Sequence, residues 1–276
     1  MGNGKVVLVT GSSRGIGRGL ALGFAKAGYD VAVHYCSAQD EGKRVQSEVE
    51  ALGVRTCLLS GNTGEANVPE RLIAETVAQL GCLDVFVANA GIFRDVCLME
   101  LTPELIDEVY TVNFRGVILG AGAAARYFVK NKIPGNILFN TSVRAFNAHS
   151  GDGIYGGLKA GINRAIESFA CDLGRYGIRV NGFAPGVINI SCPPGEEESA
   201  HPFYGNTHRF IPLRKNGCPK DVAEVAVWLA SDAAAYVTGA VIKVDAGLSS
   251  VGAPEGFNDL YNKFDLKRLP KQEERE

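Results

Sequence analysis

Short, almost continuously apolar segments alternate along the chain with longer segments in which apolar residues recur at helical spacing. The short segments lie at residues 5–10, 30–35, 54–60, 83–88, 135–140, 178–184 and 240–245. Strands buried on both faces have this character, which is typical of parallel sheets. The helical patterns lie at residues 15–28, 38–52, 66–80, 102–131, 154–176 and 219–231. This alternation predicts a doubly wound, seven-stranded parallel sheet with helices on both faces and right-handed crossovers.

The pattern predicts one domain followed by an extension. No linker, internal repeat or low-complexity stretch interrupts residues 1–250, so we expect a single Rossmann-fold domain that binds a dinucleotide and carries the catalytic residues. In residues 251–276, apolar side chains recur at i, i+3, i+4 and i+7 (Phe257, Leu260, Tyr261 and Phe264). This spacing predicts a short amphipathic helix. The helix would dock on its own domain, cross to a neighbouring subunit or close over a pocket.

Composition narrows the class of partner. The net charge of −2 gives no electrostatic footprint for nucleic acid or for an anionic membrane, which favours a small-molecule substrate. The seven cysteines are scattered without a C-x-x-C pair, so we expect reduced thiols and no metal site. The longest apolar run, residues 116–129, is too short to span a membrane and contains Arg126. With no secretory signal recognised, these features predict a soluble, cytoplasmic protein.

A glycine-rich turn follows the first apolar segment. Glycines stand at positions 11, 15 and 17, and a helical pattern begins at Ile16. Backbone N–H groups in such a turn can approach a pyrophosphate, with the positive end of the helix behind it. A tight strand-to-helix turn without a ligand is the alternative interpretation.

Tyr155 and Lys159 are four residues apart in the helical segment 154–176. Residues at i and i+4 share a helix face, so the ammonium can lie near the phenol. A unit charge ~4 Å away at an effective dielectric of ~20 contributes up to ~4 kcal/mol, or about three pKa units. This predicts a phenol that donates and accepts protons near neutral pH, whereas the alternative is an exposed surface pair. The intervening Gly156 and Gly157 would allow the close approach of a cofactor ribose or a neighbouring helix.

Together these features resemble the short-chain dehydrogenase/reductase superfamily over about residues 4–248. The matching motifs are T-G-x-x-x-G-I-G at 10–17, N-A-G at 89–91, Asn113, Ser142, Tyr155-x-x-x-Lys159 and Pro185-Gly186. The resemblance implies an NAD(P)-dependent oxidoreductase that moves a hydride between nicotinamide C4 and a CH–OH carbon. It implies that Tyr155 exchanges a proton with the substrate oxygen and that Ser142 orients this oxygen. Lys159 would hold the nicotinamide ribose and lower the tyrosine pKa, and Asn113 would position a water in the proton relay.

The second strand segment indicates which cofactor is preferred. It runs VAVHYCSAQ and has no acidic residue before Asp40, so a ribose 2′-phosphate would meet no repulsion there. Arg14 resembles the basic residue of NADP-preferring members, and we therefore expect NADP(H), with NAD as the less favoured alternative. Asn62 and Ile190 stand where the family usually has an aspartate and a threonine. The expected cofactor contacts are Gly11, Ser13, Arg14, Gly15, Ile16, Gly17, Tyr35, Ser37, Asn62, Thr63, Asn89, Ala90, Gly91, Tyr155, Lys159, Pro185, Gly186 and Ile188.

The substrate is less well defined by the sequence. The expected substrate contacts are Ser142, Arg144, His149, Tyr155, Val187 and Ile190. The surrounding segments 93–96, 143–152 and 187–212 mix polar and apolar residues, which suits a sugar, a polyol or a small ketone. A 3-oxoacyl or sterol substrate, and a non-catalytic nucleotide-sensing protein, remain alternatives. The resemblance extends to glucose 1-dehydrogenases and 3-oxoacyl-carrier-protein reductases, and it implies a homotetramer or homodimer.

Overall fold

A seven-stranded parallel sheet forms the centre of the molecule. A computed structural model describes residues 4–190 and 207–250. The strands are β1 (Val6–Val9), β2 (Asp30–Tyr35), β3 (Thr56–Ser60), β4 (Val85–Ala88), β5 (Asn136–Asn140), β6 (Arg179–Pro185) and β7 (Val241–Val244). Their order across the sheet is β3-β2-β1-β4-β5-β6-β7, and every neighbouring pair is parallel. The predicted sheet is therefore confirmed, and its strand order reverses between β1 and β4.

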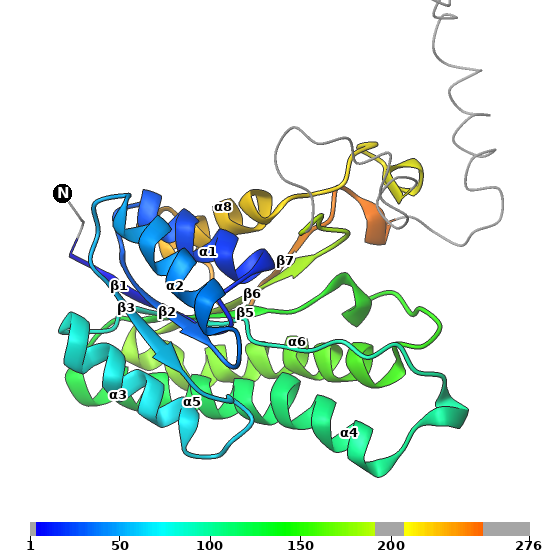
Figure 1. The fold of residues 1–276 in the computed structure, drawn as a ribbon, viewed down its shortest axis with the longest axis horizontal. Coiled ribbons are helices and arrows are strands. Elements are labelled where there is room, and N and C mark those ends of the chain that lie inside the picture. The colour runs from blue at the N-terminus through cyan, green and yellow to red at the C-terminus, as the bar shows by residue number, and fades with distance from the viewer. Residues whose placement is uncertain (1–3, 191–206, 251–276) are drawn as a thin grey trace, which may run out of the picture.

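Helices cover both faces of the sheet (Figure 1). One face carries α1 (Gly15–Lys26), α2 (Gln39–Glu50) and α8 (Pro219–Ala230). The other carries α3 (Val68–Leu80), α5 (Val117–Asn131) and α6 (Gly153–Leu173), with α4 (Pro103–Tyr110) leading into α5. Each face has its own core cluster of buried side chains. The helix predicted over 102–131 is divided, because a π-helical segment, Thr111–Gly116, joins α4 to α5.

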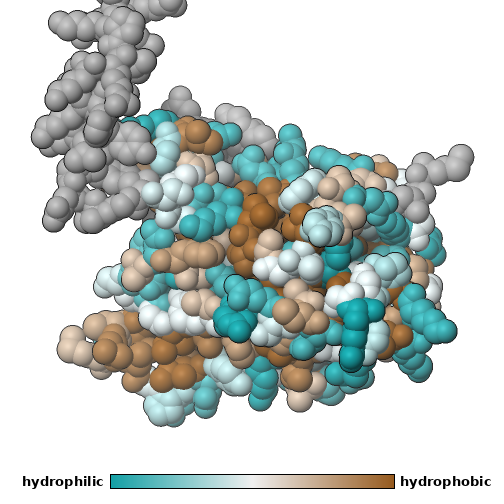
Figure 2. Space-filling model, turned by 180° about the vertical axis from the view of Figure 1, so that it is seen from behind, coloured by the Kyte–Doolittle hydropathy of each residue, from teal (hydrophilic) through white to brown (hydrophobic). Residues whose placement is uncertain are grey.

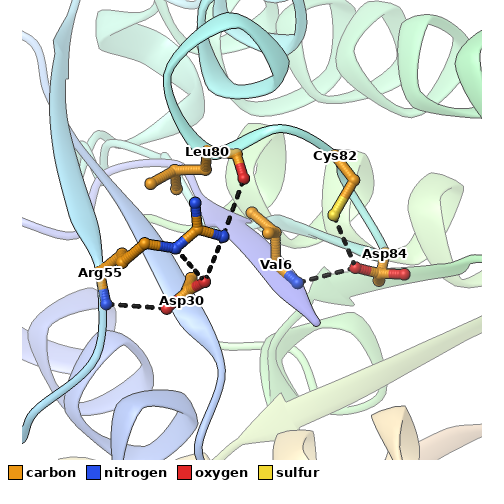
Figure 3. Close-up of polar contacts among 6 residues, drawn as sticks. All are labelled: Val6, Asp30, Arg55, Leu80, Cys82 and Asp84. Atoms are coloured by element: carbon orange, nitrogen blue, oxygen red, sulfur yellow. Dashed lines mark hydrogen bonds and ion pairs between the residues drawn. The ribbon is translucent and has the colours of Figure 1, made fainter. Parts of the chain in front are cut away.

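Charged side chains tie the amino ends of the strands together (Figure 3). The Asp30 carboxylate accepts hydrogen bonds from Arg55 N at 2.7 Å and from Arg55 Nε at 2.8 Å. Arg55 Nη2 in turn donates to Leu80 O at 3.0 Å, and Asp84 Oδ2 accepts from Val6 N at 2.7 Å. Hydrogen bonds to charged groups are stronger than neutral ones. These contacts join β1 with β4, and β2 with the start of β3, at the amino edge of the sheet. The predicted site lies at the opposite, carboxyl edge.

The two glycines between Tyr155 and Lys159 differ in their surroundings. A Cβ built on Gly156 would lie 2.8 Å from Arg144 O, in the 3-10 turn η3 (Val143–Ala145). A Cβ on Gly157 would meet no described atom within 4 Å. Close packing within the chain therefore requires glycine at position 156, where the neighbour is a backbone turn. Nothing in the described part of the chain requires glycine at position 157.

The reverse side of the molecule mixes polar and apolar residues, with apolar surface near its centre and at one lower corner (Figure 2). This corner corresponds to α4 and the preceding 3-10 turn η1 (Leu98–Glu100), where Leu98 and Met99 are highly exposed. The homotetramer or homodimer stays a prediction. Within residues 4–190 and 207–250, no helix is long and apolar enough to cross a membrane. The amphipathic helix predicted around 257–264 lies outside the described residues.

Candidate active site

The glycine turn after β1 has the geometry of an anion cradle. Gly11 and Gly15 have φ values of +65° and +54°, which favour glycine. A Cβ on Gly11 would lie 2.9 Å from the Cα of Ala90, so the turn also needs glycine for close packing against the loop after β4. No side chain caps the amino end of α1. Its first N–H groups are therefore available to a pyrophosphate, and the turn fits a dinucleotide.

His34 supports this turn from within the sheet. Its Nδ1 accepts a hydrogen bond from Gly11 N at 2.9 Å, and its Nε2 lies 3.0 Å from Gly61 O. Because a carbonyl oxygen can only accept, Nε2 carries the proton and the imidazole is neutral. Burial lowers the pKa of His34 to about 4, from an ordinary value of 6.5. The sequence analysis did not single out His34. A histidine within a mainly apolar strand segment could have indicated a buried, hydrogen-bonded imidazole.

A row of hydrogen-bonded amides connects the glycine turn to the Tyr-Lys helix. Asn89 Nδ2 donates to Thr10 O at 2.8 Å and to Gly11 O at 3.1 Å. Asn140 Nδ2 donates to Asn89 Oδ1 at 2.8 Å, and Lys159 Nζ donates to Asn140 O at 2.7 Å. We call this row, formed by Asn89 and Asn140, the amide bridge. It crosses the carboxyl edge from β1 through β4 and β5 to α6.

Ser142, Tyr155 and Lys159 come together at this edge, as the sequence predicts. Ser142 follows β5, and its hydroxyl is close enough to the Tyr155 phenol to lower the pKa of that phenol. The Lys159 ammonium lies 5.6 Å from the centre of the Tyr155 ring and is only 4% exposed. Burial lowers the pKa of Lys159 to about 8.

The pKa of Tyr155 is raised, whereas the sequence analysis expected it to be lowered. Burial raises it above the ordinary value of 10.0, and the nearby Asp152 carboxylate acts in the same sense. The Ser142 hydroxyl and the charge of Arg144 oppose this shift without outweighing it. Lys159 is not among the groups that shift the pKa of Tyr155; its ammonium donates to Asn140 O and lies against the tyrosine ring. The lowered pKa predicted from the sequence is therefore not found in the chain alone.

Asn113 holds the loop that follows β4. It is fully buried in the π-helical segment, where its Oδ1 accepts from Ile92 N at 2.7 Å and its Nδ2 donates to Ile92 O at 2.6 Å. Single-turn π-helical segments are frequent at functional sites. The side-chain amide of Asn113 is thus engaged with the backbone of Ile92, and the relay water that the resemblance implies stays a prediction.

Two loops form one wall of the site. Phe93, in the loop after β4, packs edge-on against Tyr155 with ring centres 5.2 Å apart. The Arg144 guanidinium lies 5.0 Å from the centre of the Phe93 ring and pairs with Asp152 at 3.1 Å. Val96 N donates to Gly151 O at 2.9 Å, which joins the two loops. The sequence analysis placed Asp152 in a segment around the substrate and did not predict its pairing with Arg144.

The remaining predicted contacts lie at the same edge. Those after β1, β2 and β3 are Ser13, Arg14, Ile16, Gly17, Tyr35, Ser37, Asn62 and Thr63, and those after β4 and β6 are Asn89, Ala90, Gly91, Pro185, Gly186, Val187, Ile188 and Ile190. Arg14 and Ser37 are exposed, whereas Ile188 is buried. Asn62 Oδ1 already accepts a hydrogen bond from Gly64 N. His149 is exposed, and the predicted pocket residues at 191–206 lie outside the described chain.

Metal ligands do not cluster in the described part of the chain. Among residues 4–190 and 207–250, no group of three or more histidine, cysteine, aspartate or glutamate side chains could hold a metal ion.

The known proteins that this chain resembles are described as dehydrogenases and reductases. The family model described as Enoyl-(Acyl carrier protein) reductase matches residues 11–249. The chain is 35% identical over 248 residues to an L-rhamnose 1-dehydrogenase (NAD(P)(+)) from Sphingomonas sp., covering 89% of this chain and 96% of that protein. It is 36% identical over 245 residues to a 3-oxoacyl-[acyl-carrier-protein] reductase from Staphylococcus aureus, covering 88% and 98%. A short chain dehydrogenase from Burkholderia cenocepacia, solved in complex with NADP, has a TM-score of 0.81 at 30% identity and covers 89% and 98%.

The neutral imidazole of His34 predicts an acid-sensitive fold. The unfolded chain binds a proton at an ordinary pKa of 6.5, whereas the folded chain binds it only at about 4. The contribution of His34 to the free energy of unfolding should therefore be fully present above pH 6.5. It should be lost as the pH falls from 6.5 towards 4, and its size is on the order of 3 kcal/mol. The variant His34→Gln, which does not titrate, should lose this part of the pH dependence in urea unfolding. An unchanged slope between wild type and variant would show that His34 is not the source.

Proposed function

Because the chain belongs to the short-chain dehydrogenase/reductase superfamily of NAD(P)-dependent oxidoreductases, we propose that it interconverts a secondary alcohol and a ketone with NADP(H). The observation that carries this proposal is the gathering of Ser142, Tyr155 and the buried Lys159 at the carboxyl edge, where Lys159 lies against the tyrosine ring and is tied through Asn140 to the glycine turn. No folding requirement explains a buried lysine and two hydroxyls gathered at one point. The alternative of a non-catalytic nucleotide sensor gives no use for this set.

In this proposal, the chain positions the reacting oxygen and manages its proton. The bound cofactor supplies the carbon that gives or takes the hydride. Ser142 and Tyr155 hold the substrate oxygen by hydrogen bonds, and Tyr155 gives it a proton in the reductive direction or takes one in the oxidative direction. The raised pKa keeps the phenol protonated at neutral pH in the chain alone, which favours the donor form. Lys159 keeps two of its three donors for the ribose and the phenol after bonding to Asn140 O.

The cofactor side of the proposal rests on the turns after β1 and β2. The uncapped start of α1 would bind the pyrophosphate through backbone N–H groups. Arg14 and Ser37 are exposed beside it and would bind a 2′-phosphate. No acidic residue stands between Tyr35 and Asp40 to repel that phosphate or to select the free 2′-hydroxyl of NAD. The rhamnose dehydrogenase relative is named for both cofactors, so the preference for NADP(H) is proposed from Arg14 and the missing acid.

Removing the Tyr155 hydroxyl tests the reaction. Tyr155→Phe keeps the ring against Phe93 and should lower kcat by roughly 100-fold or more, because general acid–base catalysis contributes that much. The dissociation constant for NADPH should change by less than about threefold, since the ring and Lys159 remain. The measurement is reduced-nicotinamide absorbance with a panel of ketones, sugars and polyols. Tyr176→Phe, at an exposed tyrosine beyond α6, is the matched control. Retained activity in Tyr155→Phe would reject the assigned role.

Removing the charge at position 14 tests the choice of cofactor. Arg14→Gln should weaken NADPH binding by about tenfold, the effect of losing one charge-assisted hydrogen bond of ~1.4 kcal/mol. NADH binding should change by less than about twofold, because its ribose carries no 2′-phosphate. Lys26→Gln, at the far end of α1, removes the same charge away from the turn. Fluorescence titrations of the wild type and both variants with both nucleotides give the six dissociation constants. Tighter binding of NADH than NADPH by the wild-type protein would contradict the proposed preference.

A further inference from the structure

We propose that Arg144 binds a carboxylate of the substrate, so that the enzyme interconverts a hydroxy acid and the corresponding oxo acid. This inference rests on the proposed function, because it names the substrate class of the same site. It is carried by the position of Arg144, by its free hydrogen-bond donors and by the way Asp152 holds it.

Arg144 lies one aromatic ring away from the reacting phenol. It stands in η3, two residues after Ser142, and its guanidinium is 5.0 Å from the centre of the Phe93 ring. The other contact of Phe93 is the Tyr155 ring, at 5.2 Å. The guanidinium is also close enough to Tyr155 for its charge to act on the phenol. Because the side chain is 28% exposed, a ligand held at Ser142 and Tyr155 can reach it.

The donors of Arg144 are only partly used within the chain. Nη1 bonds to Asp152 Oδ2 at 3.1 Å, and this is the one hydrogen bond that the guanidinium makes with the described residues. Nε and Nη2 together form the side-on edge of the guanidinium, which binds carboxylates through two parallel hydrogen bonds. The same edge of Arg18 makes this pairing with Glu48 elsewhere in the molecule, at 2.7 and 3.1 Å. Arg144 therefore keeps its carboxylate-binding edge available.

Asp152 orients Arg144 without blocking that edge. Its carboxylate is 4% exposed, and its second oxygen accepts a hydrogen bond from His149 N at 3.3 Å. Asp152 is thus occupied on both oxygens and lies away from solvent. The contact of the guanidinium with the face of Phe93 restrains the arginine as well. The side chain is preorganised, which reduces the entropy lost when a ligand binds.

The available groups fit an acid better than a neutral polyol. A polyol hydroxyl needs an acceptor as well as a donor, whereas a carboxylate is a pure acceptor. At this position the chain offers two N–H donors, and the neighbouring acceptor, Asp152, is already bonded. A compact acid would place its carboxylate at Arg144 and its hydroxyl-bearing carbon near Tyr155. The alternative is that Arg144 only anchors Asp152 at the start of α6.

The test compares each acid with its neutral ester. The substrates are 3-hydroxybutyrate, glycerate and gluconate, each against its methyl ester, with NADP⁺ and the wild-type protein. We expect kcat/KM for at least one acid to exceed that of its ester by about tenfold or more, the range of one charge-assisted pairing. Arg144→Gln should lower kcat/KM for that acid by about tenfold more than for its ester, mainly through KM, because the lost charge acts on Tyr155 equally with both substrates. Arg144→Lys keeps the charge and loses the paired donors, so its kcat/KM for the acid should lie between those of the wild type and Arg144→Gln.

Two controls separate recognition from folding. Arg175→Gln removes a matched arginine that lies 4.8 Å from the Tyr176 ring, beyond the end of α6, and should leave the acid preference unchanged. NADPH affinity should be the same in Arg144→Gln as in the wild type, because the cofactor turn is not touched.

The outcomes distinguish the two proposals. Equal kcat/KM for acids and esters, or an equal loss for both in Arg144→Gln, overturns carboxylate recognition and leaves the proposed reaction intact. Turnover of neutral ketones or sugars, with no turnover of any of the acids, likewise overturns carboxylate recognition and leaves the proposed reaction intact. Absence of turnover with every substrate overturns the proposed reaction and the carboxylate inference together.

Discussion

The amide bridge is the interaction on which the rest of the site depends. The Asn89 side chain bonds to the glycine turn and accepts from the Asn140 side chain, and the backbone carbonyl of Asn140 accepts from Lys159, so the row spans three strands and one helix. Breaking a buried hydrogen bond of this kind leaves a polar group unpaired, which costs about 1–3 kcal/mol. The nucleotide turn and the Tyr-Lys helix therefore cannot shift independently. The charged ties at the amino edge hold the same strands from the opposite end.

Burial decides the electrostatics of the site more than the pairing of charges does. It lowers the pKa of Lys159 and His34 and raises that of Tyr155, because each charged form loses contact with water. The chain alone thus holds a protonated phenol and a neutral imidazole. Arg144 and Ser142 act on Tyr155 in the opposite direction, and Asp152 keeps Arg144 in place. The cofactor turn and the substrate wall are built by these buried polar groups.

Periodicity in the sequence was enough to predict the sheet, since each strand is apolar throughout and the helices alternate with it. The motifs also placed Ser142, Tyr155 and Lys159 at one edge. The π-helical segment was not predictable, because no residue in Thr111–Gly116 distinguishes it from an α-helix. The direction of the Tyr155 shift was missed because helical spacing gives proximity and says nothing about burial. Gly156 and Gly157 look alike in sequence, and only the turn at Arg144 separates them.

The central claim is that the Asn89 and Asn140 side chains act as one connection between the cofactor turn and the end of β5, where the backbone carbonyl of Asn140 holds Lys159. A double-mutant cycle with Asn89→Ala and Asn140→Ala, measured on the dissociation constant for NADPH, tests it most directly. Residues in one hydrogen-bond network couple by about 0.5–3 kcal/mol, so the double variant should lose clearly less affinity than the two single losses added together. Losses that add within about 0.3 kcal/mol would contradict the claim, because the two amides would then support the site separately.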